Sequence, residues 1–208
     1  MTDHLTFDEE RHAFFWKGQP TPSITQVLKA EGCIDDQWYT EEGRVRGTYV
    51  HFATELHDRA PERQIQIDPA LEGYYQAYLR FKQDTGFLPI PELIEAKLYS
   101  AAYDFAGIPD RAGLLNGNKV IIDLKTGAVD EEVVKLQTAA QEILMAEHGP
   151  FSARYALQLK TDGSYRLFGP WIHIQDKDDF KQLRRSLSVK LRRGFITWEQ
   201  ITGKEPSQ

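Results

Sequence analysis

Three charged residues lie close together around one short apolar stretch of the chain. Asp110 precedes a turn, and the apolar residues 120–122 lead directly into Asp123, with Lys125 two positions later. Side chains at positions i and i+2 of a strand project from the same face. We therefore expect Asp123 and Lys125 to project together from the end of a buried strand. An acid and an amine in such a place either form an ion pair or bind a ligand.

This arrangement suits the metal-assisted hydrolysis of a phosphodiester. Carboxylate oxygens are preferred ligands of Mg²⁺ and Mn²⁺. A bound metal lowers the pKa of its water and stabilises charge on the attacked phosphate. A nearby lysine can orient that water or neutralise the developing charge. The alternative is a surface hairpin with one Asp–Lys ion pair, and such pairs are common and weak. The surrounding residues have to decide between the two interpretations.

Composition limits the classes of protein to which this chain can belong. Its 208 residues suit one domain, or one domain with an appendage, and 41% hydrophobic residues allow a sizeable core. No apolar run approaches the ~20 residues that cross a bilayer, and the acidic start lacks a signal-peptide pattern. Cys33 is the only cysteine, which excludes an internal disulfide and a cysteine-held Zn or Fe–S site within one chain. We expect a protein of the reducing cytoplasm.

Periodicity and turn signals predict helices first, then a cluster of strands, a helix, a hairpin and a closing helix. A capping box at Ser23 and Gln26 begins the first helix, and Asn116-Gly117 is a hairpin turn signal. The apolar stripe of the second helix consists of Tyr49, Phe52, Ala53 and Leu56. This order indicates an α/β fold with a central mixed sheet flanked by helices. The predicted helices cover about 24–30, 40–57, 71–85, 133–148 and 176–193, and the predicted strands cover 93–99, 103–108, 114–115, 120–124, 153–159 and 165–168.

Several further residues carry polar chemistry in apolar surroundings. His51 lies at the edge of the helical stripe, where a satisfied, partly buried side chain is the alternative to a ligand. Glu95 lies within an apolar segment, where a carboxylate is costly unless it is paired or bound to metal. The alternative for Glu95 is a surface position on an edge strand. Gln137 and Gln141 lie one turn apart on the helix that follows Lys125.

Taken in order, these residues resemble the PD-(D/E)xK nucleases of the RecB-type, phage-exonuclease branch. The resemblance covers about residues 20–170, and Gln141 departs from it because the family usually has Tyr there. The matching segments are Pro22-Ser-Ile-Thr25, Arg46-Gly47-x-x-x-His51, the glutamate Glu95, Gly107-x-x-Asp110, Asp123-x-Lys125-Thr126-Gly127 and Gln137-x-x-x-Gln141.

The resemblance implies a restriction-endonuclease-like core and a site for one or two Mg²⁺ or Mn²⁺ ions. The implied metal ligands are His51, Asp110, Asp123 and the backbone carbonyl of Leu124. Lys125 would position or help to activate the attacking water, and Glu95 would bind a second metal or hold a metal-bound water. Gln137, Gln141 and Arg46 are the implied DNA contacts, with bracing of the site as the alternative for Gln137 and a structural ion pair for Arg46.

The last predicted helix is basic, because residues 181–193 contain no acid. Its Arg184, Arg185 and Arg192 could follow a DNA backbone, since neutralising phosphates is the main source of sequence-independent affinity. The alternative is a solvated helix face whose cations suit the negative end of the helix dipole. We expect a single domain with its core at about 20–175, this helix at about 176–193 and a frayed tail at 202–208.

The leading hypothesis is a metal-dependent DNA exonuclease that acts on linear DNA with a free end. Phages use such enzymes in recombination, repair or DNA processing, so the expected setting is the cytoplasm of a bacterial or phage-infected cell. The chain has no phosphate-binding loop of a helicase motor, and a single-strand annealing or binding protein and self-association are both compatible with the resemblance. The alternatives are an endonuclease of the same fold, which would need a base-reading element, and a catalytically inactive DNA-binding or recruitment module. The four intact groups His51, Asp110, Asp123 and Lys125 argue against the module, because idle buried charges are costly.

Overall fold

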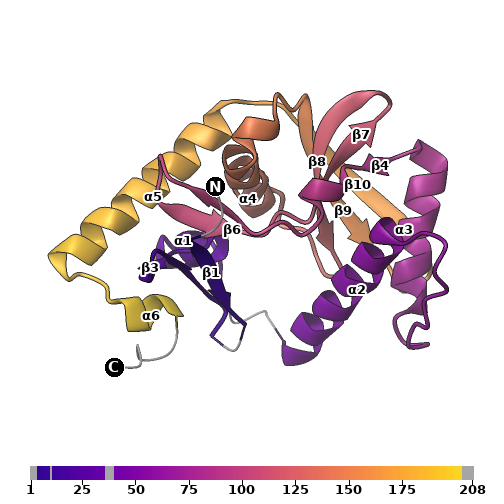
Figure 1. Cartoon of the computed structure of the whole chain (residues 1–208), viewed down its shortest axis with the longest axis horizontal. Helices are drawn as coiled ribbons and strands as arrows, with labels where there is room; N and C mark the ends of the chain where they lie inside the picture. The colour runs from indigo at the N-terminus through magenta and orange to yellow at the C-terminus, as the bar shows by residue number, and fades with distance from the viewer. Residues whose placement is uncertain (1–3, 10, 36–39, 203–208) are drawn as a thin grey trace.

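A computed structural model describes residues 4–9, 11–35 and 40–202, and a five-stranded mixed sheet lies at its centre (Figure 1). The strand order is β10-β9-β8-β7-β4, in which β8 and β9 are parallel and the other neighbours are antiparallel. The described strands are β1 (Leu5–Asp8), β2 (Ala13–Trp16), β3 (Gln19–Thr21), β4 (Leu88–Pro89), β5 (Leu98–Ser100), β6 (Phe105–Gly107), β7 (Arg111–Leu115), β8 (Asn118–Lys125), β9 (Ala153–Leu159) and β10 (Tyr165–Trp171).

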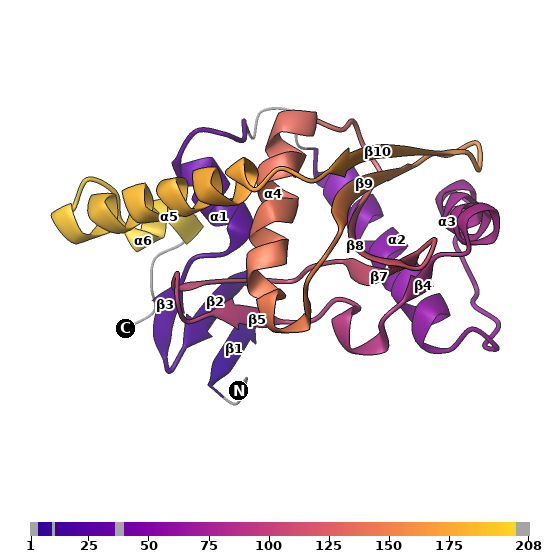
Figure 2. The ribbon, with the colours of Figure 1, turned by 90° about the horizontal axis from the view of Figure 1, so that it is seen from above.

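Helices cover both faces of this sheet, so the predicted fold class is confirmed. Figure 2 shows α4 on one face and α2 with α3 on the other. The described helices are α1 (Ile24–Ala30), α2 (Glu41–Arg59), α3 (Glu72–Thr85), α4 (Glu131–Leu144), α5 (Gln175–Arg193) and α6 (Trp198–Thr202), with 3-10 turns η2 (Pro91–Leu93) and η3 (Ala146–His148). None of the described helices is long and apolar enough to cross a membrane.

Alternation along β8 places its polar residues on one face of the sheet. Leu124 belongs to the apolar cluster that includes Phe81 of α3. Asp123 and Lys125 lie on the opposite face, where both make hydrogen bonds to side chains of α4. The sequence prediction that these two residues share a face is therefore confirmed. The β7–β8 turn was also predicted correctly, with Asn116 and Gly117 at φ 50° and 77°, as a two-residue hairpin turn requires.

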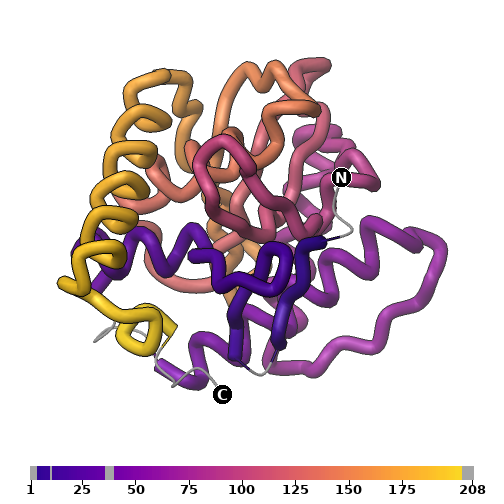
Figure 3. The backbone as a smooth tube through the Cα atoms, turned by 60° about the vertical axis from the view of Figure 1, so that its left-hand side comes forward, coloured from indigo at the N-terminus to yellow at the C-terminus, as the bar shows by residue number. Residues whose placement is uncertain are grey.

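A second layer of elements packs outside α4. Helices α1 and α5 contact α4, and α6 returns to α1. Figure 3 shows these yellow C-terminal helices beside the indigo N-terminal segment. The start of α1 carries the predicted capping box, because Ser23 and Gln26 each accept a hydrogen bond from the other's backbone N–H. Residues 203–208, most of the predicted frayed tail, lie outside the described residues.

Two sequence predictions about local structure were wrong. No single strand covers 93–99: Pro91 opens a 3-10 turn, Glu95 has left-handed backbone geometry with φ 47°, and only residues 98–100 of this segment are a strand. The stripe of Tyr49 and Phe52 does not face the core, since these side chains are 59% and 62% exposed. The buried face of α2 is formed by Val50 and Thr54 together with Ala53, which is the buried member of the predicted stripe. Helix α6 was not predicted.

We predict that Gly73→Ala lowers the free energy of unfolding by roughly 1–3 kcal/mol. Gly73 lies in α3 against the β9–β10 turn, and a Cβ there would meet the backbone oxygen of Thr161 at 1.8 Å. Urea unfolding measures the effect. Gly47→Ala in α2 is the matched control, because its Cβ would only make an ordinary contact of 3.7 Å with Thr126. Alanine should stabilise that helix by up to about 1 kcal/mol. Equal effects in the two variants would contradict the prediction.

Candidate metal centre

The β7–β8 hairpin brings two carboxylates side by side at the end of the sheet. Arg111 and Ile122 are the last paired residues at this end of the β7–β8 hairpin. Asp110, just before Arg111, and Asp123, just after Ile122, therefore lie next to each other. Asp110 Oδ2 accepts a hydrogen bond of 2.6 Å from the backbone N–H of Leu124. The Asp123 side chain is fully buried, and that of Asp110 is nearly so. Two acids on the two strands of one hairpin thus share one buried edge.

Helix α2 adds an imidazole to this edge. His51 Nδ1 lies 3.2 Å from Glu95 Oε1 and 3.6 Å from Asp110 Oδ1, and Nε2 lies 3.3 Å from the carbonyl oxygen of Leu124. His51, Glu95 and Asp110 each offer one potential ligand atom, and these three atoms all lie within 4.8 Å of one another. The carbonyl of Leu124 belongs to the same cluster through its contact with the imidazole.

Asp123 and Lys125 form the other half of the centre, facing α4. Lys125 Nζ lies 2.7 Å from Asp123 Oδ2 and donates a hydrogen bond of 3.0 Å to Gln137 Oε1. The Nε2 atoms of Gln137 and Gln141 both donate to Asp123 Oδ1, at 2.9 Å and 2.8 Å. Gln141 is only 1% exposed, so the predicted contact with DNA is replaced by a contact with a buried carboxylate.

Behind these groups lies a buried ion-pair network that the sequence interpretation missed. The guanidinium of Arg111 donates to Asp58 Oδ2 at 2.7 Å, to Glu95 Oε1 at 2.9 Å and to the Asp110 carbonyl at 2.6 Å. Asp58 also accepts hydrogen bonds of 2.6 Å from Tyr78 and from Lys82. The sequence does contain one signal of this network. Arg111 stands directly before the apolar residues Ala-Gly-Leu-Leu, and a charge that is buried with such a strand needs a partner.

The crowding of charges shifts the pKa of several groups. Burial opposes protonation of His51, but the Asp110 charge and the contact with Glu95 raise its pKa to about 9. Burial, with the charges of Asp123 and Glu95, raises the pKa of Asp110 to about 7 despite the opposing charge of His51. The contacts of Glu95 with His51 and Arg111 outweigh its burial and lower its pKa. At pH 7 the centre therefore holds a protonated imidazole between an ionised Glu95 and an Asp110 carboxyl that is only partly ionised.

The donor set fits a divalent cation that prefers oxygen. The carboxylates, the Leu124 carbonyl and one imidazole nitrogen match the ligand types of Mg²⁺ and, with nitrogen better tolerated, Mn²⁺. Among the implied ligands, His51 and Asp110 lie in one cluster with Glu95, whereas the Asp123 carboxylate is held on the α4 side by Lys125, Gln137 and Gln141.

The predicted basic contacts have different surroundings. Arg46 lies 5.7 Å over the Tyr74 ring, and its buried Nε has no hydrogen-bond partner among the described residues. Arg185 and Arg192 are exposed on α5. Arg184 is 5% exposed, and its guanidinium is bonded to Asp104 and Ser188. Arg184 therefore ties α5 to the segment before β6, and the prediction that it contacts DNA does not fit its burial.

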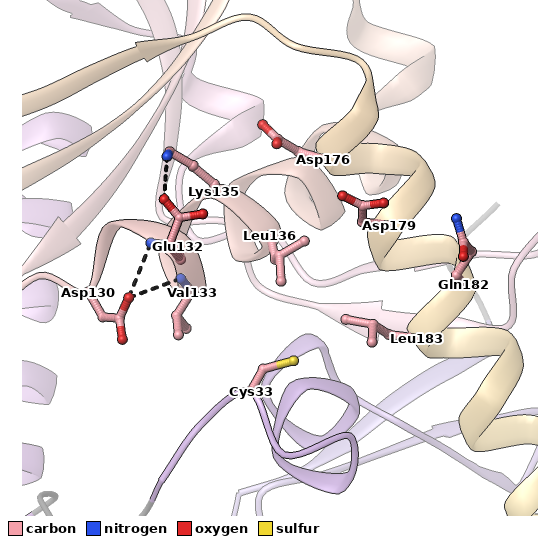
Figure 4. A pocket seen from close by; sticks show the side chains of 10 residues that line it. All are labelled: Cys33, Asp130, Glu132, Val133, Lys135, Leu136, Asp176, Asp179, Gln182 and Leu183. Atoms are coloured by element: carbon pink, nitrogen blue, oxygen red, sulfur yellow. Dashed lines mark hydrogen bonds and ion pairs between the residues drawn. The ribbon is translucent and has the colours of Figure 1, made fainter.

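A separate groove of about 540 Å³ lies between α4 and α5, with Cys33 below it (Figure 4). Its apolar lining includes Leu136 and Leu183, and among the described residues Lys135 is the only basic one that lines it. Four acids line it: Asp130, Glu132, Asp176 and Asp179. This excess of negative charge repels phosphate, so the groove is an unsuitable path for a nucleic acid. None of the residues of the carboxylate–imidazole cluster lines it.

Fold and side chains define a mixed α/β protein with a buried carboxylate–imidazole centre suited to a divalent metal. No known protein-family model matches the sequence, and no curated protein matches it either. Among solved structures, the chain is similar to an alkaline exonuclease (LHK-Exo) from Laribacter hongkongensis. The likeness covers 84% of this chain and 89% of that one, with 13% sequence identity and a TM-score of 0.45.

We predict that Arg111→Met lowers the free energy of unfolding by about 3–5 kcal/mol, because it leaves the buried carboxylates Asp58 and Glu95 without their shared partner. Chemical denaturation of the metal-free protein measures this. Arg44→Met is the control: Arg44 forms an exposed ion pair with Glu41 on α2, and its loss should be within error of wild type. Equal midpoints for the two variants would show that the network does not stabilise the fold.

Proposed function

We propose that this protein is a metal-dependent deoxyribonuclease, and specifically an exonuclease that acts on linear DNA with a free end. The observation that carries the proposal is the convergence of Asp110, Asp123, His51 and the Leu124 carbonyl at one edge of the sheet, with Lys125 beside them. The same proposal includes action in the cytoplasm of a bacterial or phage-infected cell. It also includes self-association and a single-strand annealing protein as a partner.

In this mechanism the chain's own groups hold the metal and orient the water. Asp110, Asp123, His51 Nε2 and the Leu124 carbonyl would be the ligands. When bound, the ion would lower the pKa of a water and stabilise charge on the phosphate. Glu95 bonds His51 Nδ1 and so keeps Nε2 directed at the Leu124 carbonyl. This contact favours an orienting role for Glu95 over that of a second-metal ligand.

Lys125 is placed to act on the attacking water and on the phosphate. Its ammonium is bonded to Gln137 Oε1 and paired with Asp123 Oδ2, while its side chain remains one-quarter exposed. A cation held in this way needs little reorganisation to stabilise negative charge that develops beside it. Arg46, whose Nε has no hydrogen-bond partner among the described residues, is the proposed phosphate contact on α2, and Arg185 and Arg192 are further candidates.

We predict that the protein shortens end-labelled linear DNA with Mg²⁺ or Mn²⁺, that EDTA stops this, and that Lys125→Ala slows it by roughly 100-fold or more. Time courses on 5′- and 3′-labelled single- and double-stranded DNA measure the rate and the polarity. Lys119→Ala is the control: Lys119 is at the far end of β8, where its ammonium bonds to the His148 carbonyl and lies over the Phe151 ring, so the rate of this variant should stay at the wild-type value.

Three other outcomes would change the assignment. Cleavage of closed circles as fast as linear DNA would indicate an endonuclease. DNA binding without cleavage at any metal concentration would favour a recruitment module. Cleavage that persists in Lys125→Ala and in EDTA would contradict the proposed site altogether.

We also predict that Mn²⁺ affinity rises by about ten-fold per pH unit from about pH 8 to about 9, and more steeply near pH 7, where Asp110 also loses a proton on binding. In the metal-free protein, Asp110 and Glu95 raise the pKa of His51 to about 9, so the imidazole is protonated at pH 7. A metal ligand must be deprotonated, so binding must expel this proton and becomes easier as the pH rises. Titrations without DNA at several pH values measure the slope. His51→Gln should reduce the slope over this range, and a flat profile in the wild type would show that His51 is not a ligand.

A further inference from the structure

Two glutamine amides converge on a single carboxylate oxygen in this protein. Gln137 and Gln141 lie one turn apart on α4, a spacing that puts both side chains on the same helix face. Their Nε2 atoms donate to Asp123 Oδ1 at 2.9 Å and 2.8 Å. The Asp123 side chain is fully buried, so these amides satisfy an oxygen that would otherwise be costly to bury.

The two oxygens of Asp123 consequently have different surroundings. Oδ1 receives two hydrogen bonds from α4, whereas Oδ2 faces the ammonium of Lys125 at 2.7 Å. Rotation of the carboxylate would break both amide contacts. The amides therefore fix which oxygen is directed to Lys125.

Gln141 has a further feature that a purely structural residue would avoid. It is 1% exposed, and its own Oε1 is buried without a hydrogen-bond partner among the described residues. Turning the amide over would not solve this, because its oxygen would then face Asp123 Oδ1, and neither oxygen carries a hydrogen. An unsatisfied buried oxygen opposes folding, and local rules of this kind are broken mainly at functional sites.

We propose that Gln141, together with Gln137, is a positioning residue that holds Asp123 Oδ1 and so presents only Oδ2 to the metal and to Lys125. This inference rests on the proposed metal-dependent function and names the residues that set metal affinity at that site. Gln141 acts through Asp123, since it is buried behind that carboxylate. Groups that orient a ligand in this way typically change metal affinity by 10–100-fold.

The test is Mn²⁺ binding to the DNA-free protein, followed by the electron paramagnetic resonance signal of free Mn²⁺. Gln141→Met keeps a similar side-chain size but removes the donor, and we expect binding at least about 10-fold weaker than in the wild type. Thr138→Val is the matched control. Thr138 is a buried polar residue on the same helix, and among the described residues its hydroxyl bonds only to α4 carbonyls, so the Mn²⁺ affinity of this variant should be unchanged.

A double-mutant cycle separates positioning from general destabilisation. In an Asp123→Asn background, Gln141→Met should have little further effect on Mn²⁺ affinity, because the amide acts only through that side chain. A similar further loss in this background would overturn the inference. If Gln141→Met does not fold, as judged by thermal melting, Gln137→Met decides, because Gln137 is partly exposed and donates to the same oxygen. Gln137→Met should also weaken Mn²⁺ binding.

The remaining outcomes separate this inference from the proposed function. If the wild type binds Mn²⁺ and the glutamine variants bind it equally well, the positioning role is refuted while the metal site stands. If the wild type binds neither Mn²⁺ nor Mg²⁺, the metal site itself fails, and the positioning role fails with it.

Discussion

The buried guanidinium of Arg111 is the interaction on which the geometry of the centre depends. It has no solvent exposure, and it bonds Asp58 of α2, Glu95 and the carbonyl of Asp110. A lone charge in this position would be prohibitively costly, so its carboxylate partners must stay within hydrogen-bond distance. Because α2 also carries His51, the ion pairs fix the helix against the start of β7. Directional contacts thus hold imidazole and carboxylates together, where apolar packing alone would tolerate small shifts.

Glu95 shows how this network imposes an unfavourable local conformation. Its φ of 47° is uncommon for a residue with a long side chain and costs of order 1 kcal/mol or more. The contacts with Arg111 and His51, and a backbone hydrogen bond of 3.0 Å to Asp110, offset that cost. The apolar pattern around Glu95 predicts a strand, and the prediction fails at the residue whose conformation is determined by partners far away in sequence.

Other successes and failures of prediction follow the same division between local and long-range causes. The capping box at Ser23, the Asn116-Gly117 turn and the shared face of Asp123 and Lys125 depend on residues a few positions apart, and sequence predicts them. The network of Arg111 depends on residues from separate segments. The apolar strand after Arg111 indicates that this charge needs a partner, but no local pattern identifies the partners. The burial of Arg184 under Asp104 is of the same kind. The stripe of Tyr49 and Phe52 failed for a different reason: periodicity detects an apolar face without showing what covers it.

The charges of the centre bear on how a protein with a net charge of −6 would act on a polyanion, as the proposed function requires. Glu95, Asp110 and Asp123 contribute three negative charges when ionised, and three cations oppose them: His51, Lys125 and Arg111. With all three carboxylates ionised, the metal-free centre is close to neutral. On the proposed mechanism a divalent ion would add two positive charges while His51 loses its proton and one positive charge. The centre would then carry one excess positive charge. A phosphodiester carries the matching negative charge, so attraction for DNA at this centre would arise with the ion that also promotes hydrolysis.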